Sequence, residues 1–125
     1  MKKTILIADD NRIIRKIMVE IIKRKFSDTY NIECFEDGKS LDERLSQNLE
    51  GVCAVVTGNQ MSGIKGLEII KKHASELINR PFILHYFGDK EIGEEAKRNG
   101  AYGYVIKGDY KYRLNDVLSE ALGSA

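Results

Sequence analysis

Short apolar runs alternate along the chain with segments in which apolar residues recur every three or four positions. The runs have the length and composition of strands covered on both faces, and they lie at residues 4–8, 32–35, 52–57, 82–86 and 102–107. The segments that follow them have the apolar periodicity of amphipathic helices, which we expect over residues 13–26, 41–49, 67–77, 89–99 and 114–122. Five strand–helix units without an internal repeat or linker predict an α/β fold with one doubly wound, five-stranded parallel sheet.

Polar and turn-forming residues mark the ends of these elements. Asp10 or Asn11 is a suitable N-cap for the first helix, because a short side-chain oxygen can accept hydrogen bonds from the free amides of the first turn. Asp37 and Gly38 give a turn signal before the second helix. Pro81 opens the fourth strand, where its missing N–H has the smallest effect.

The third strand is a near-continuous apolar run that stops at Gly58. In open α/β sheets, ligands and chemistry are usually found at the carboxyl ends of central strands. Here residues 52–57 are followed by Gly58, which has no side chain to react, and then by a polar, glycine-rich loop up to Gly66. The chemistry available to the protein depends largely on that glycine.

Composition narrows the class of protein without changing this picture. A chain of 125 residues is expected to form one domain, residues 1–125. Nothing in it resembles a signal peptide, and no apolar stretch approaches the length of a membrane span. We therefore expect a cytoplasmic protein. The net charge is +1, and Cys34 and Cys53 lie in separate predicted strands without metal-site or disulfide spacing, so both are expected to be small core residues.

Several motifs, in order and spacing, resemble the receiver domain of bacterial response regulators. They cover nearly the whole chain: Asp9-Asp10 after the first strand, Gly58-Asn59-Gln60-Met61 and Gly66-Leu67-Glu68 around the third loop, Pro81, and Gly100-Ala101-Tyr102-Gly103-Tyr104-Val105-Ile106-Lys107. The resemblance implies a CheY-like, flavodoxin-like sheet with strand order 2-1-3-4-5. It also implies a role in two-component (phosphorelay) signal transduction.

The resemblance further implies roles for individual residues. In such receivers an acidic pair binds Mg²⁺ together with a third aspartate, which accepts a phosphoryl group from a histidine kinase. Asp9 and Asp10 match the acidic pair, and Lys107 matches a lysine that supplies positive charge to the phosphoryl oxygens. Tyr104 matches an aromatic residue that changes rotamer on activation.

The departures from the family pattern lie at the active positions. Gly58 stands at the phosphoacceptor position, and Tyr86 stands where a Thr or Ser reports the phosphoryl group. Ser62 and Gly108 replace two prolines. Without a carboxylate at position 58 no acyl phosphate can form there, so the chain resembles a pseudo-receiver. Natural divergence accounts for four departures better than one engineered substitution, although either could produce Gly58.

These departures lead to expectations about the pocket. We expect the Tyr86 ring to lie over Gly58, with its hydroxyl near Asp10 or Lys107, because close packing disfavours an empty space. Lys107 is expected to neutralise the acidic pair. No cofactor is required on this reading; Asp9 and Asp10 either bind Mg²⁺ weakly or act only as a helix cap.

Three classes of function remain. The first, which we favour, is a non-enzymatic adaptor whose protein partner, or a second copy, binds the fourth helix, fifth strand and fifth helix (residues 89–99, 102–107 and 114–122). Tyrosines could anchor that contact; they are Tyr102, Tyr104, Tyr110 and Tyr112. The second is a conventional receiver with a displaced acceptor, Thr57 or Asp10, served by a histidine kinase. The third is a flavodoxin-like ligand binder. Nucleic-acid binding by the basic first helix is not favoured, since no recognition motif is present.

Overall fold

Five parallel strands form a single sheet in a computed structural model, which describes residues 2–107 and 110–123, without the side chains of residues 110–112. The strands are β1 (Lys3–Ala8), β2 (Tyr30–Phe35), β3 (Val52–Thr57), β4 (Phe82–Tyr86) and β5 (Gly103–Ile106). Their order is β2-β1-β3-β4-β5, and every neighbouring pair is parallel. The predicted fold class and strand order are thus confirmed.

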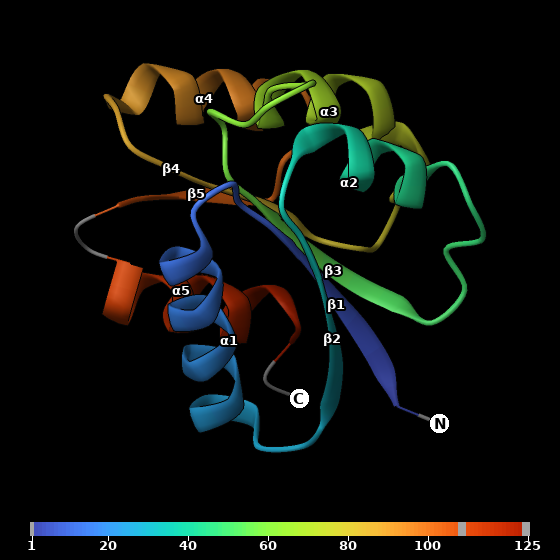
Figure 1. The fold of residues 1–125 in the computed structure, drawn as a ribbon, viewed down its shortest axis with the longest axis vertical. Helices are drawn as coiled ribbons and strands as arrows, with labels where there is room; N and C mark the ends of the chain where they lie inside the picture. Colours follow the sequence, from blue (N-terminus) through green and yellow to red (C-terminus); the bar gives the residue numbers. More distant parts are fainter. Residues whose placement is uncertain (1, 108–109, 124–125) are drawn as a thin grey trace.

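Helices cover both faces of the sheet (Figure 1). They are α1 (Arg12–Phe26), α2 (Gly38–Leu45), α3 (Gly66–His73), α4 (Lys90–Arg98) and α5 (Tyr110–Ala121), with a short 3-10 turn, η1 (Ala74–Glu76), after α3. In Figure 1, α1 and α5 lie on one face of the sheet, and α2, α3 and α4 lie on the other. Of the helices described, none has both the length and the apolar character that a membrane crossing requires.

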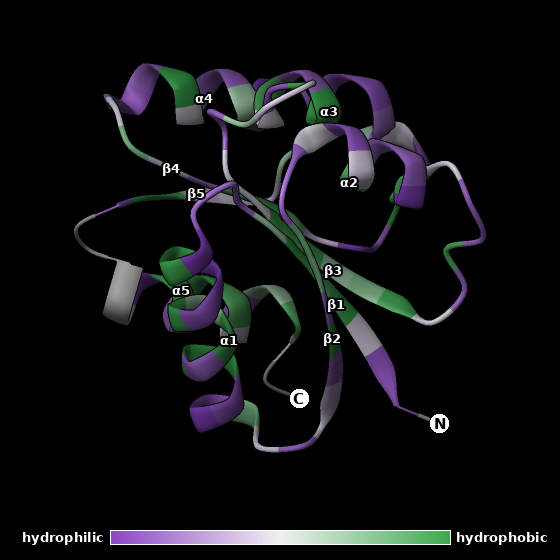
Figure 2. Ribbon diagram, in the orientation of Figure 1, coloured by the Kyte–Doolittle hydropathy of each residue, from purple (hydrophilic) through white to green (hydrophobic). Residues whose placement is uncertain are grey.

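The core consists of two apolar layers, one on each side of the sheet. One layer joins alternate residues of β1, β3 and β4 to α1 and α5; it includes Ile5, Ile7, Val56, Ile83 and Leu118. The other joins the remaining strand residues to α2, α3 and α4; it includes Leu6, Val55, Ile70, Leu84 and Tyr86. Strand side chains alternate between the two faces, which is why the central strands are mostly apolar (Figure 2).

Local sequence signals explain most of the helix starts. The Asn11 side chain accepts from the amides of Ile13 and Ile14, so Asn11 rather than Asp10 is the N-cap of α1. Asp37 caps α2, and Asp89 caps α4.

Three details differ from the sequence prediction. The α3 helix ends at His73, because the chain tightens into η1, where the Leu77 amide bonds to the Ala74 carbonyl. The α2 helix ends at Leu45 instead of residue 49. Cys34 is exposed and Cys53 half-buried, so the core assignment was wrong for Cys34, which lies on the edge strand β2 with a neighbouring strand on one side only.

Close contact between backbone segments sets the loop that follows β3. A Cβ atom on Gly66 would lie 1.9 Å from the carbonyl oxygen of Gly58, so only glycine allows α3 to begin this close to the end of β3. The Gly66 amide donates to the Asn59 carbonyl, and the Leu67 amide donates to the Asn59 side chain, both at 2.9 Å. The backbone at Gly58 is therefore held firmly beside β1.

Candidate functional site

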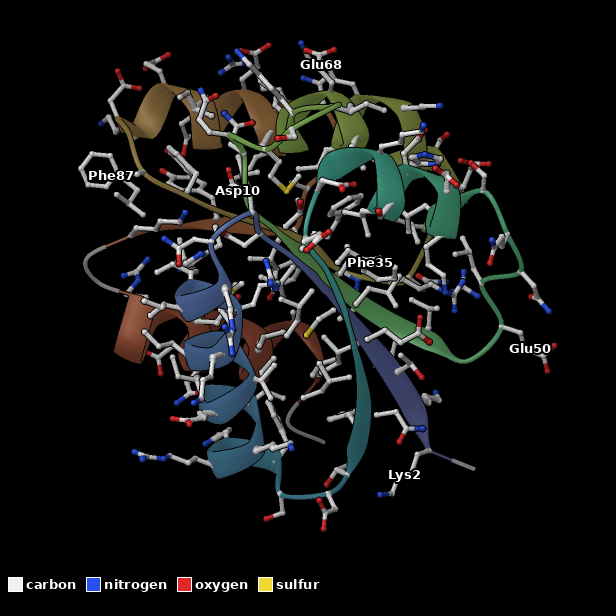
Figure 3. All side chains as sticks on the ribbon, viewed as in Figure 1. Lys2, Asp10, Phe35, Glu50, Glu68 and Phe87 are labelled. Carbon is white, nitrogen blue, oxygen red and sulfur yellow. The ribbon has the colours of Figure 1, made fainter. Side chains whose placement is uncertain are left out.

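The carboxyl ends of β1 and β3 bring Asp9 and Gly58 together. Ala8 and Thr57 are partners in the sheet register, and the Gly58 amide donates to the Ala8 carbonyl at 2.8 Å. Asp9 is 1% exposed, whereas Asp10 is exposed. Figure 3 shows Asp10 at this edge of the sheet, where the chain leaves β1. The two carboxylates thus have different environments despite being adjacent in sequence.

Asp9 has contacts through both its carboxylate and its backbone carbonyl. Its Oδ1 accepts from the Asn11 amide at 2.9 Å, and its Oδ2 lies 3.1 Å from the Lys107 Nζ. Its carbonyl accepts from Arg15 at 2.8 Å. Lys107 follows β5, and its own amide donates to the Tyr86 carbonyl at 2.6 Å, which sets the position of the lysine. The buried charge of Asp9 is balanced by the ammonium group of Lys107.

The space beside Gly58 is lined by Asp9. A Cβ atom built on Gly58 would lie 2.8 Å from Asp9 Oδ2 and 3.3 Å from Asp9 Cγ, and its next nearest atom is the Ala8 carbonyl oxygen. A side chain at position 58 therefore requires a small rotation of Asp9. The expectation that the Tyr86 ring fills this space is wrong; the Asp9 carboxylate lies there instead.

Tyr86 points into the core and toward α4. It is 0% exposed, and its hydroxyl donates to the Asp89 carbonyl and accepts from the Gly93 amide, the latter at 3.0 Å. Burial raises the pKa of its hydroxyl. The expected position of the hydroxyl near Asp10 or Lys107 is thus wrong, because Tyr86 shares the sheet face of Leu84, which packs toward α2, α3 and α4.

Tyr104 lies over the same helix. A Cβ atom on Gly93 would lie 2.3 to 2.5 Å from three atoms of the Tyr104 ring, so the ring packs directly on the helix backbone. The Tyr104 hydroxyl donates to Glu94 at 2.8 Å, and this hydrogen bond is the main reason that the pKa of Tyr104 is raised. The ring centroids of Tyr86 and Tyr104 are 6.1 Å apart.

A shallow groove of about 300 Å³ runs along α4, β5 and α5. Its lining includes both aromatic and charged side chains: Glu94, Lys97, Tyr102, Tyr104, Arg113, Val117 and Glu120. Tyr102 is 40% exposed and donates to Glu120 at 2.7 Å. The side chains of Tyr110 and Tyr112, and residue Gly108, lie outside the described part of the chain.

His85 adds a buried titratable group near the site. It is 0% exposed, and its pKa is lowered to about 4, first by burial and then by the positive charge of Lys107. The imidazole is therefore neutral at pH 7.

Sequence reasoning missed two contacts of the site. The hydrogen bond from Arg15 to the Asp9 carbonyl joins residues six positions apart, and no local sequence pattern predicts it. The Tyr86 hydroxyl bonds to Gly93 across seven positions, and the only sequence signal is a glycine inside a helical segment, which often marks close packing.

The residues at this edge do not fit a dedicated Mg²⁺ site. Mg²⁺ requires oxygen ligands in octahedral geometry. Asp9 Oδ1 already accepts a hydrogen bond, and Oδ2, which accepts none, lies 3.1 Å from the Lys107 ammonium group. Within residues 2–107 and 110–123, no three His, Cys, Asp or Glu side chains are grouped so that they could hold a metal ion. A cation would have to compete with Lys107 for Asp9.

Comparison with known proteins gives a consistent result. The sequence profile of the family described as the response regulator receiver domain matches residues 5–119. The chain is 31% identical over 119 residues to the uncharacterized transcriptional regulatory protein YesN of Bacillus subtilis, an alignment that covers 94% of this chain and 32% of YesN. The chain spans about a third or less of the length of the curated relatives it matches.

Solved structures share the fold at low sequence identity. A response regulator receiver domain protein from Clostridium thermocellum superposes with a TM-score of 0.84 at 17% identity, covering 98% of this chain and 95% of that one. A chain from the CheX–CheY–BeF₃–Mg²⁺ complex of Borrelia burgdorferi gives a TM-score of 0.82, also at 17% identity, covering 94% of this chain and 87% of that one.

Proposed function

Because the chain belongs to the response regulator receiver domain family, we propose that it serves two-component signalling through protein contacts, without phosphorylation of an aspartate. The observation that carries the proposal is Gly58 at the carboxyl end of β3, beside a buried Asp9–Lys107 ion pair. Glycine has no side-chain carboxylate to attack phosphorus, so the acyl phosphate of a conventional receiver cannot form at this position.

Neighbouring oxygens are poor substitutes for the missing carboxylate. Thr57 is 0% exposed, and its hydroxyl donates to the Gly58 carbonyl and contacts the sulfur of Met61. Asp9 is buried and paired with Lys107. Asp10 is exposed, but an acceptor must also be held in line with the leaving group, and an exposed side chain at the edge of the pocket is not held in this way.

We further propose that the groove along α4, β5 and α5 is the contact surface. Tyr102 and Tyr104 supply aromatic area, and acidic and basic side chains border it on both sides. A surface of mixed charge suits either a protein partner or a second copy of the chain. A similar chain comes from the CheX–CheY–BeF₃–Mg²⁺ complex of Borrelia burgdorferi, and this supports a protein contact as the output of a chain with this fold.

The same reasoning gives a non-enzymatic protein without a required cofactor. We propose that any Mg²⁺ binding is weak, because the cation would displace Lys107 from Asp9. Isothermal titration with MgCl₂ tests this directly. Tight binding by the native chain would contradict the assignment.

Intact-protein mass spectrometry after incubation with acetyl phosphate and Mg²⁺ tests the main proposal. The native chain should remain unmodified, and Gly58→Asp should gain one phosphoryl group if Asp9 rotates to admit the new side chain. Gly58→Asn is the matched control, because its amide has nearly the same shape and cannot form an acyl phosphate. Labelling of Gly58→Asp alone supports a pocket silenced by one residue.

Two other results have clear meanings. If none of the three proteins is labelled, the pocket has changed beyond position 58, and output without phosphorylation still stands. If the native chain is labelled to the same extent as Gly58→Asp, the proposal is overturned, and peptide mapping must then locate a displaced acceptor.

A further inference from the structure

The first turn of α4 contains a side-chain hydroxyl between two backbone groups. In α1 the cap residue and the fourth helical residue bond directly, the Arg15 amide donating to the Asn11 carbonyl at 3.0 Å. The corresponding pair in α4 is the Gly93 amide and the Asp89 carbonyl. Both of these groups bond instead to the hydroxyl of Tyr86, which accepts from Gly93 at 3.0 Å and donates to Asp89.

We propose that the Tyr86 hydroxyl is a structural part of α4 and fixes the helix to β4 in one arrangement. A hydroxyl is both donor and acceptor, so it can bridge an amide and a carbonyl that a helix would otherwise join directly. Groups inserted in this way open the helical hydrogen-bond ladder and set the direction of the helix. Because the Tyr86 ring is buried in the core, the direction of α4 is tied to the end of β4.

The same connection reaches the proposed contact surface through Gly93. Tyr86 holds the Gly93 backbone from the core side, and the Tyr104 ring lies against Gly93 where a Cβ would be. Tyr104 is further held by Glu94, the next residue of α4. A displacement of α4 would therefore disturb the packing of Tyr104 on Gly93. Tyr86 acts as a positioning residue for the contact surface along α4, β5 and α5, although its own side chain is buried.

The site around Asp9 and Gly58 meets Tyr86 through its backbone, whose carbonyl accepts from the Lys107 amide, and not through its hydroxyl. Tyr86 shares no side-chain hydrogen bond with Asp9 or Lys107; its hydroxyl is committed to Asp89 and Gly93. The inference rests on the proposed function only in naming α4, β5 and α5 as the output surface. The bridging role of Tyr86 holds whether or not a phosphoryl group can be accepted.

Amide hydrogen exchange followed by NMR on Tyr86→Phe tests the inference. The variant keeps the ring and its packing but removes both hydrogen bonds, so the Gly93 amide should exchange about five- to tenfold faster, the effect of losing one typical hydrogen bond. The amide and ring resonances of Tyr104 should shift as well. Tyr102→Phe is the matched control, because it removes an exposed tyrosine hydroxyl bond to Glu120 and leaves α4 unchanged.

The readout distinguishes this inference from the proposed function, since it uses neither a phosphodonor nor a partner. Faster exchange at Gly93 in Tyr86→Phe, with native rates in the central strand β3, supports the bridge. Exchange at Gly93 within about twofold of the Tyr102→Phe value would overturn it, because a typical hydrogen bond changes the rate by more than this. General loss of protection, including β3, would also count against a local role for the hydroxyl.

Discussion

Replacing His85 with glutamine should weaken the dependence of stability on pH between about 6.5 and 4. His85 is buried in β4, and burial together with the charge of Lys107 lowers its pKa from 6.5 to about 4. As the pH falls below 6.5, the unfolded chain takes up a proton that the folded protein excludes. Stability attributable to neutral His85 is therefore present above pH 6.5 and is lost as the pH falls toward 4.

The size of the effect follows from the two pKa values. Each pKa unit corresponds to about 1.4 kcal/mol, so the complete difference is about 3 kcal/mol. Between pH 7 and pH 5 the linkage relation gives a loss of about 2 kcal/mol from this one group. Glutamine does not titrate, so the variant lacks this contribution while keeping every other acid-sensitive group.

Urea unfolding at pH 7, 6 and 5, followed by far-UV circular dichroism because the chain has no tryptophan, measures both proteins on one scale. The variant is expected to be less stable at pH 7, where a buried imidazole has been replaced, but its stability should fall less on acidification. The informative quantity is the difference between the two slopes. Parallel stability curves for the native chain and His85→Gln would refute the reasoning.

Two further predictions concern packing and charge. Gly93→Ala should lower the free energy of unfolding by about 1 to 3 kcal/mol, because the new methyl group would overlap the Tyr104 ring. Gly103→Ala should change it little, because its Cβ would lie 3.6 Å from its nearest neighbour. Thermal unfolding that ranks the two variants equally would contradict this packing. Lys107→Ala should lower the free energy of unfolding by about 2 to 3 kcal/mol, because it leaves the buried Asp9 carboxylate without its counter-charge. Adding Asp9→Asn should restore part of this loss. Strictly additive effects of the two substitutions in urea unfolding would show that the pair contributes no coupling.

The fold could be predicted largely from local patterns. Continuous apolar runs identified the strands, because residues 52–57 and 82–86 are buried on both faces and need no polar alternation. The second strand was predicted over residues 32–35 only, and β2 begins two residues earlier, at Tyr30. An edge strand is less completely covered, so its sequence carries a weaker signal, and the exposure of Cys34 has the same origin.

The site was harder to predict because side-chain direction decides it. The resemblance to receivers predicted that Asp9, Gly58 and Lys107 would lie together at one edge of the sheet. Which group lies beside Gly58 depended on rotamers, and the answer was the neighbouring carboxylate instead of the ring of Tyr86. Sequence spacing could not predict that Tyr86 bonds to a helix amide seven residues later.

The two departures at Gly58 and Tyr86 have a common consequence for signalling. A conventional receiver requires a pocket that changes charge and a nearby hydroxyl that can move in response. Here position 58 has no carboxylate to accept the charged group, and the hydroxyl at position 86 is bonded to the backbone of α4. Restoring aspartate at position 58 would therefore return the chemistry without the response, because Tyr86 would still hold α4.

On this argument, Gly58→Asp should accept a phosphoryl group while the Gly93 and Tyr104 resonances stay at their unmodified positions. The double variant Gly58→Asp with Tyr86→Thr should accept the group and show those resonances shifting on phosphorylation. Large shifts at Gly93 and Tyr104 in phosphorylated Gly58→Asp alone would show that Tyr86 does not restrain the surface.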